Sequence, residues 1–352
     1  MRFLSLKITN LRCIESLRFD PGQNINIVSG ANGTGKTSVL EAVSLACLGR
    51  SFHTNREKDL LRRGQKVLRV EAQIQGPKDE VFNIDVKKRG KLSKIHRDGQ
   101  IVPSASALAR MSPSVAVHSR ITEMLVSSPA NRRALIDRTM FHVEPQYIAS
   151  WKLYRRALKQ RNELLRNNGN CNEATFWHDV LDEHGSFIER NRKRLIEWVN
   201  QELKHIVQTG KFCRYLLQYA SGWKESEHLS ESLERNWVKD RHLGYTSSGI
   251  HRSDLVLIDE TGQNVKNLSR GQIKFIIICL MVAFARFIGH SIGRKPVLLV
   301  DDLAAELDDD LRSSLVEIIC EFGTQTFFTA IRDTDLPELT ALEKTILRME
   351  HR

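Results

Sequence analysis

The sequence Gly30-Ala31-Asn32-Gly33-Thr34-Gly35-Lys36-Thr37 decides the fold of this chain. It has the spacing G-x-x-x-x-G-K-[ST] of a phosphate-binding loop. Residues 24–28 before it predict a strand, and residues 38–48 after it carry apolar side chains at helical spacing. A glycine-rich turn of another kind is the alternative, but the order strand, loop and helix favours a nucleotide site.

The loop predicts both a nucleotide and a metal. Glycines let consecutive backbone N–H groups converge on phosphates, and the following helix adds the positive end of its dipole. Lys36 is expected to reach the β- and γ-phosphates of ATP, and the Thr37 hydroxyl to bind Mg²⁺. The predicted ATP-binding residues of the loop are Gly30, Ala31, Asn32, Gly33, Thr34, Gly35, Lys36 and Thr37.

The composition favours a polyanionic partner. The chain has 352 residues, enough for two lobes, and its 53 Lys and Arg against 42 Asp and Glu give a charge of +11. This surplus suits nucleic acid or an anionic membrane surface. The longest apolar run, around 275–285, is shorter than the roughly 20 residues that cross a bilayer, and residues 1–8 lack the apolar centre of a secretion signal. We therefore expect a cytoplasmic protein without a membrane segment.

Two further motifs lie near the far end of the chain. Leu268-Ser269-Arg270-Gly271-Gln272 precedes an apolar segment with the length of a helix, although Ser269 by itself would also suit an ordinary helix N-cap. Residues 297–300 predict a buried parallel strand, and Asp301 and Asp302 follow it directly. Asp301 is therefore a second candidate for holding Mg²⁺. A pair of aspartates in a solvated loop is the alternative.

The order of these motifs resembles that of the ABC/SMC superfamily of ATPases. There, a Leu-Ser-Gly-Gly-Gln signature closes over the γ-phosphate held by a second subunit. The resemblance implies an ATP-dependent homodimer in which Ser269, Gly271 and Gln272 contact the nucleotide of the partner copy. Residues 305–308, Ala-Glu-Leu-Asp, resemble the D-loop, which contacts the second subunit.

The resemblance also assigns roles beside the metal. Asp302 stands where most members have the Glu that orients the attacking water, and its shorter side chain predicts slow hydrolysis. Arg12 matches a position that contacts phosphates in SMC-like heads, so it joins the expected nucleotide-binding residues. The residues implied for catalysis are Asp302, Lys36 and, in trans, Ser269.

Further segments resemble the RecF family within this superfamily. No heptad run separates the phosphate loop from the signature, which excludes the long coiled coil of SMC proteins. The resemblance implies an α/β fold, with an ABC/SMC-type ATPase head of mixed sheets and a mainly helical second lobe. We expect the ATPase lobe to comprise 1–112 and 291–352, and the helical lobe with the signature to comprise 113–290. The segments that carry the resemblance are 6–12, 49–52, 132–137, 158–162 and 249–255.

The RecF resemblance implies a role in DNA repair. Members bind gapped DNA and the junctions between single- and double-stranded DNA, and with RecR and RecO they promote RecA loading, replication restart and SOS induction. We therefore expect a weak, DNA-stimulated ATPase that contacts no membrane. Basic residues on the expected helices are candidates for DNA contact: Arg155, Arg156, Lys159, Arg161, Arg166, Arg190, Arg192, Lys193 and Arg194.

Two alternatives stay open, and departures from the family pattern motivate the first of them. Ala305 replaces a common Ser, a Pro-Glu pair is missing near 117–122, and no clear switch His follows the segment 324–329. These changes predict a weak hydrolysis trigger. One alternative is therefore a nucleotide-sensing scaffold with negligible turnover, and the other is the ATPase subunit of an ABC transporter.

Overall fold

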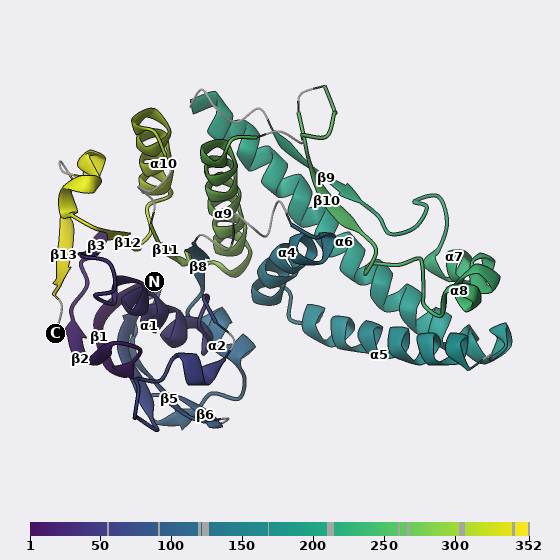
Figure 1. The fold of residues 1–352 in the computed structure, drawn as a ribbon, viewed down its shortest axis with the longest axis horizontal. Coiled ribbons are helices and arrows are strands. Elements are labelled where there is room, and N and C mark those ends of the chain that lie inside the picture. Colours follow the sequence, from purple (N-terminus) through teal and green to yellow (C-terminus); the bar gives the residue numbers. More distant parts are fainter. Residues whose placement is uncertain are drawn as a thin grey trace. The chain divides into compact units, whose positions relative to one another are not determined.

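The chain folds into two compact units. The computed structural model describes residues 1–54, 56–90, 92–118, 121, 127–167, 169–209, 215–259, 261–265, 268–302, 307–339 and 342–350. One unit consists of Met1–Glu123 and Leu268–Arg352, and the other of Met124–Asn267. Figure 1 shows that the first unit combines sheets and helices and that the second is mainly helical.

A five-stranded parallel sheet carries the phosphate loop in the first unit. All four residues of β11 are buried, as the short apolar run predicts for a strand covered on both faces. Helix α1 (Lys36–Leu48) packs against β3, β8 and β12. The strand order is β13 (Lys344–Met349), β3 (Ile25–Gly30), β12 (Thr326–Ala330), β11 (Val297–Val300) and β8 (Ser114–Val117).

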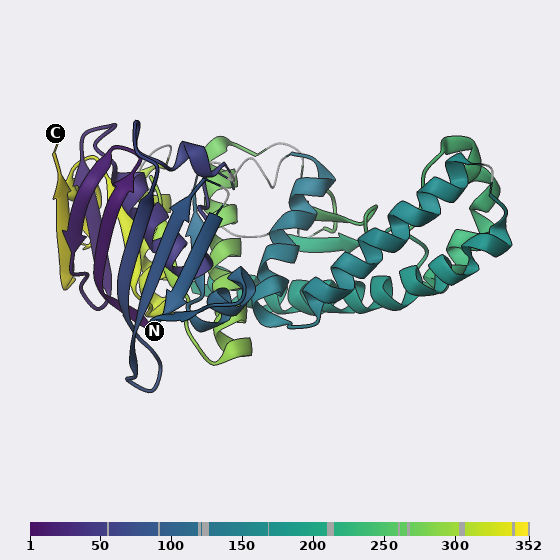
Figure 2. The same cartoon turned by 90° about the horizontal axis from the view of Figure 1, so that it is seen from below.

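A six-stranded antiparallel sheet forms a second layer of this unit (Figure 2). Alternate side chains of β4 are buried, which is the pattern of a sheet with one face on the core. The buried face shares one apolar cluster with α1 and β12, which includes Phe3, Val39 and Phe327. The strand order is β2 (Ile14–Phe19), β1 (Arg2–Leu11), β4 (Leu68–Gln75), β5 (Val81–Arg89), β6 (Leu92–Arg97) and β7 (Gln100–Ile101).

Helix α9 (Arg270–Ile292) is the apolar helix of the first unit. Among the described residues it is the one helix long and apolar enough to cross a membrane, yet 72% of its most apolar stretch is buried. It packs against β8 and α10 (Asp309–Phe322). The helix has 23 residues, more than the apolar run around 275–285, and is long enough to span a bilayer. Its burial, and not its length, therefore identifies it as a core helix.

The boundary between the units differs from the expected one at residues 112 and 290. The structure places β8 and α9 in the first unit, because β8 pairs in parallel with β11 and α9 packs beside α10. The signature motif at the start of α9 therefore belongs to the same unit as the phosphate loop. The remaining elements of this unit are η1 (Glu57–Asp59), α2 (Ala105–Met111), η2 (Asp333–Asp335) and η3 (Pro337–Leu339).

The second unit consists of helices and one antiparallel pair of strands. Helix α5 (Tyr147–Arg166) packs along α6 (Cys171–Thr209), which at 39 residues is the longest helix of the described chain. The described residues thus contain no long coiled coil. All five tryptophans lie in this unit. Its other elements are α4 (Pro129–Val143), β9 (Leu216–Ala220), α7 (Leu229–Arg235), α8 (Trp237–Leu243) and β10 (Asp254–Ile258).

Candidate functional site

The phosphate loop joins β3 to α1 in a conformation that requires glycine. Gly30, Gly33 and Gly35 have φ of 154°, 85° and 103°. A Cβ at Gly30 would clash with the carbonyl oxygen of Met349, so the backbone approaches too closely for any side chain. No side chain caps α1 at Gly35, which leaves the first-turn N–H groups for an anion such as phosphate.

Lys36 folds back over this loop. Its Nζ donates to the carbonyl oxygens of Gly30 at 2.7 Å and Ala31 at 3.0 Å. Thr34 Oγ1 also donates to the Ala31 carbonyl, at 2.9 Å, and thereby closes the turn. The ammonium group is thus held at the loop by backbone acceptors, where a phosphate could replace them.

Thr37 and Asp301 meet although 264 positions separate them in the sequence. Thr37 Oγ1 lies 3.1 Å from both carboxylate oxygens of Asp301. Burial raises the pKa of Asp301, and the nearby charge of Asp302 adds to the increase, although hydrogen bonds from Thr329 and Thr37 oppose it. A hydroxyl and an incompletely stabilised carboxylate are oxygen ligands of the kind that Mg²⁺ prefers.

The donor set fits Mg²⁺ better than a metal bound by protein ligands alone. The described residues contain no group of three His, Cys, Asp or Glu side chains that could hold a metal. Mg²⁺ is usually bound by one or two carboxylates together with phosphates and water. Thr37 and Asp301 would therefore hold this ion only in part, and nucleotide phosphates would complete its shell.

Asp302 has an unusual backbone. Its φ of 57° lies in the left-handed region that side chains other than glycine seldom adopt. Its N–H donates to Thr329 Oγ1 at 2.8 Å, and its carbonyl oxygen accepts from Lys274 Nζ at 2.7 Å. The chain therefore leaves β11 by a sharp turn that contacts with β12 and α9 hold in place.

Arg12 is tethered to α1 rather than extended into solvent. Its Nη2 donates to Glu41 Oε1 at 2.8 Å, and Glu41 is fully buried one turn after Thr37. Ser51 Oγ donates to the same carboxylate at 2.5 Å. Sequence reasoning missed Glu41. The one signal for it was indirect, because its partner Ser51 belongs to the segment 49–52 that resembles RecF. This network holds Arg12 against the helix that follows the phosphate loop.

The signature residues form the N-terminus of α9. Ser269 Oγ accepts from the Gln272 N–H at 3.2 Å, and Gln272 Oε1 accepts from the Ser269 N–H at 2.9 Å. This reciprocal pair is a capping box, so the N-cap interpretation is confirmed. The helix N-terminus is partly open to solvent, and a contact with a second copy remains a prediction.

Several residues of the expected D-loop and lid segment are not among the residues that the structure describes. Ala305 and Glu306 of the D-loop, and residues 119, 120 and 122 of the altered lid segment, lie outside the described residues. Asp308 caps α10, because its Oδ1 accepts from the Leu311 N–H at 2.8 Å. The position directly after the segment 324–329, where a switch His would stand, is Ala330, the last residue of β12.

Arg161 is a structural residue and not a DNA contact, which corrects our expectation. Its side chain is fully buried in the second unit. It donates to Asp240 Oδ2 at 2.8 Å, Thr246 Oγ1 at 2.8 Å and His178 Nε2 at 3.0 Å. These contacts use the planar fork of the guanidinium to join α5, α6, α8 and the segment after α8.

Arg192 has the same role elsewhere in the unit, and this also corrects the expectation. Its side chain is 2% exposed and donates to both oxygens of Asp137, at 2.9 and 3.0 Å. It also donates to the Ile250 carbonyl and to Ser253 Oγ. Lys193 is half-buried and pairs with Glu189 and Glu225. The candidates that are exposed are Arg155, Arg156, Lys159, Arg166, Arg190 and Arg194.

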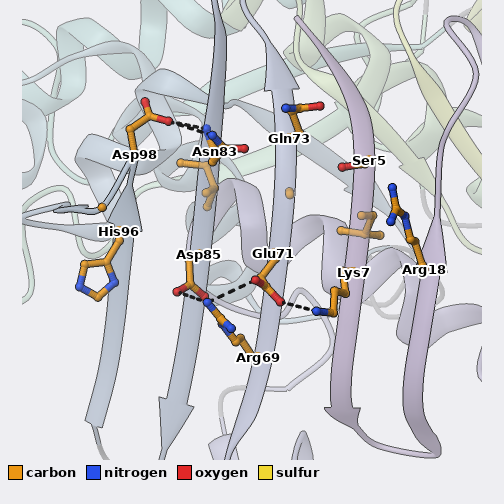
Figure 3. Close-up of a pocket in the computed structure, with 14 residues that line it drawn as sticks. Ser5, Lys7, Arg18, Arg69, Glu71, Gln73, Asn83, Asp85, His96 and Asp98 are labelled. Carbon is orange, nitrogen blue, oxygen red and sulfur yellow. Dashed lines mark hydrogen bonds and ion pairs between the residues drawn. The ribbon is translucent and has the colours of Figure 1, made fainter.

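A polar hollow of about 760 Å³ lies on the outer face of the antiparallel sheet (Figure 3). Glu71 and Asp85 lie directly opposite each other, and Arg69 contacts them at 3.2 and 2.9 Å. Lys7 reaches Glu71 from the other side at 3.5 Å. These side chains neutralise one another across three strands, which identifies the row as a structural charge ladder. None of the expected site residues lines it.

Known proteins identify the family. The model of the RecF/RecN/SMC N terminal domain matches residues 3–351. The DNA replication and repair protein RecF of Thioalkalivibrio sulfidiphilus is 33% identical over 337 residues, which are 94% of this chain and 93% of that protein. The chain belongs to the RecF family. RecF of Shewanella sp. strain MR-4 is 32% identical over 335 residues, 94% of this chain and 92% of its own.

Solved structures agree with a RecF-like ATPase head. The structure of the recombination mediator protein RecF-ATP in the RecFOR pathway has a TM-score of 0.83 and 21% identity, covering 99% of this chain and 97% of that one. An SMC head bound to the C-winged helix domain of ScpA has a TM-score of 0.56 and 15% identity, covering 96% and 91%. The expected ABC/SMC-type fold is confirmed.

Proposed function

We propose that this RecF-family chain is an ATP-gated DNA clamp of recombinational repair. The observation that carries the proposal is the contact of Thr37 with Asp301, which unites the phosphate loop and the strand β11 in one site. Gly30 to Thr37 would hold ATP, with Lys36 at the β- and γ-phosphates. Thr37 and Asp301 would hold Mg²⁺, and Arg12 would contact phosphate from the turn between β1 and β2, where Glu41 of α1 holds it.

The second half of the site would come from another copy of the chain. Ser269, Gly271 and Gln272 form a helix N-terminus that is partly open to solvent, which suits a phosphate held by a partner. ATP would therefore favour a homodimer. Asp302 would orient the attacking water, and loss of the γ-phosphate would remove the charge that joins the two copies. Hydrolysis would be weak and stimulated by DNA.

The closed dimer would bind gapped DNA and the junctions between single and double strands. The formal charge of +11 and the exposed basic residues of α5 and α6 support a phosphate-binding surface. Within this proposal the protein works in the cytoplasm with RecR and RecO and promotes RecA loading, replication restart and SOS induction. The names of related proteins, which mention DNA repair and the RecFOR pathway, support this assignment.

Sedimentation velocity tests the clamp. We expect a dimer with ATP, a monomer with ADP or without nucleotide, and a larger complex when gapped DNA is added to the ATP form. Lys36→Ala should stay monomeric under all conditions, because the γ-phosphate loses its main cationic contact. A wild-type chain that stays monomeric with ATP and DNA would overturn the proposal.

A nucleotide-sensing scaffold is the second candidate. It is favoured by Asp302, which is shorter than Glu, and by Ala330 at the end of β12. Such a scaffold would dimerise with ATP but release no phosphate. Steady-state phosphate release with and without gapped DNA distinguishes it from the ATPase. Membership of the RecF family argues against a transporter subunit.

A further inference from the structure

We infer that Thr329 is a positioning residue for the proposed ATP site, holding both aspartates at the end of β11. The inference rests on the proposed function. Thr329 Oγ1 donates to Asp301 Oδ1 at 2.8 Å and accepts from the Asp302 N–H at 2.8 Å. The residue is 2% exposed, so water does not compete strongly for these bonds.

The chemistry of the hydroxyl fixes the direction of both bonds. A backbone N–H can only donate, so the oxygen of Thr329 must accept from Asp302. Its single hydrogen is then left for the carboxylate of Asp301. A hydroxyl can make both bonds at once, whereas an apolar side chain of the same shape can make neither.

The sheet topology explains why the hydroxyl is needed here. Strands β11 and β12 are parallel neighbours, with Val300 opposite Phe328. Asp302 then turns to positive φ, and its N–H takes a side-chain acceptor on β12 rather than a backbone one. Thr329 therefore replaces a ladder acceptor where the strand ends.

The two bonds bear on different parts of the proposed reaction. The bond to Asp301 sets the rotation of the carboxylate that also meets Thr37. The bond to the Asp302 backbone, together with Lys274 at the carbonyl, sets where the proposed water-orienting side chain begins. Mutation of a residue that holds a metal ligand in place typically lowers metal affinity or activity by about 10- to 100-fold.

Thr329→Val tests this inference, with Thr326→Val as the matched control. Thr326 is buried on the same strand, but its hydroxyl donates to the Thr324 carbonyl at 3.1 Å and does not contact Asp301. Two quantities are measured: Mn²⁺ binding in the presence of ATP by electron paramagnetic resonance, and kcat and KM for hydrolysis. We expect Thr329→Val to weaken Mn²⁺ binding and lower kcat, each by about 10- to 100-fold, with a smaller change in KM. Thr326→Val should match the wild type in both.

The serine variant separates the hydroxyl from the packing. Thr329→Ser keeps the hydroxyl and should restore Mn²⁺ affinity and kcat to within about threefold of the wild type, because only a methyl group is lost. If Thr329→Val does not fold, Thr329→Ser and Thr329→Ala replace the comparison. Equal Mn²⁺ affinity and kcat with and without the hydroxyl would overturn the inference. A wild-type chain that binds no ATP would instead overturn the proposed function.

Discussion

At Arg161, one guanidinium donates to acceptors from several segments of the second unit. Its partners include the side chains of Asp240 and His178, which are buried with it, and the Leu233 carbonyl. A buried cation costs several kcal/mol unless its hydrogen bonds are made, and here all three nitrogens of the guanidinium donate. The stability of the second unit therefore depends on this side chain more than on any exposed arginine of α5.

Arg161→Met should destabilise the second unit by about 3–5 kcal/mol, because it leaves the carboxylate of Asp240 buried without its partner. Urea unfolding followed by tryptophan fluorescence measures this directly, since all five tryptophans lie in that unit. Arg156→Ala is the control and should change the free energy of unfolding by less than about 0.5 kcal/mol. Equal effects of the two substitutions would contradict a structural role for Arg161.

A buried histidine, His178, and a half-buried one, His251, make the second unit sensitive to acid. Burial, and then the charge of Arg161, lowers the pKa of His178 from 6.5 to about 4. Its Nε2 accepts from Arg161 and so must be unprotonated. Burial also lowers the pKa of His251 to about 4, and its ring lies between the Tyr154 hydroxyl and the Thr246 carbonyl. Both rings are therefore neutral in the folded state at neutral pH.

The contribution of these two histidines to the free energy of unfolding should be fully present above pH 6.5. It should decrease as the pH falls toward 4, because the unfolded chain then binds more protons than the folded one. Each histidine contributes roughly 1.4 kcal/mol per pH unit within that window. Urea midpoints across this range give the profile. His178→Gln, whose amide oxygen can still accept from Arg161, should remove about half of the dependence. A profile identical to the wild type would contradict the role of His178.

At the scale of elements, the N-terminus of α9 has one observed role and one proposed role, and substitutions of Ser269 can separate them. Ser269 caps the helix in this chain and is proposed to contact phosphate on a partner. Asp caps helices as well as Ser does, but its carboxylate would repel a γ-phosphate. The cap and the contact in trans can therefore be tested independently.

Ser269→Asp should leave thermal stability within about 0.5 kcal/mol of the wild type and abolish the ATP-dependent dimer. Differential scanning calorimetry measures the first effect and sedimentation the second. Ser269→Asn caps equally well without the charge and should keep much more of the dimer. If Ser269→Asp dimerises with ATP as readily as the wild type, Ser269 is only an N-cap.

The elements that could be predicted from sequence are those whose signal is local. The glycines of the loop, the buried run of β11 and the apolar start of α9 each follow from neighbouring residues. The contacts that complete the site are not local: Thr329 and Glu41 carry no motif, and their partners are distant in the chain. A run of basic residues likewise gives no sign that Arg161 and Arg192 face inward, because an acidic partner decides this.

At the scale of the whole molecule, the proposed DNA contact depends on basic residues that stay exposed. Arg156 and Lys159 lie on the exposed side of α5 and are proposed to face phosphates. Each phosphate contact releases counterions, so the slope of log affinity against log salt is about −0.9 per contact.

Replacing Arg156 and Lys159 by Ala should make that slope less negative by about 0.9 for each phosphate that the variant no longer binds. Fluorescence anisotropy of gapped DNA with ATP, over a range of salt, measures the slope. Arg18→Ala removes an exposed cation from the antiparallel sheet and should leave the slope unchanged. If the double variant and Arg18→Ala have the same slope as the wild type, DNA does not contact this part of α5.

The close approach of Gly30 to Met349 has a consequence for folding during translation. Strand β13 pairs in parallel with β3 and places Met349 opposite Gly30, so part of the wall beside the phosphate loop is synthesised long after the loop itself. A ribosome adding about 5–20 residues per second needs tens of seconds to pass from one to the other. During translation the phosphate loop is therefore synthesised before β13 can pair with β3. A nascent chain should acquire nucleotide affinity only once residues 344–349 have left the ribosome.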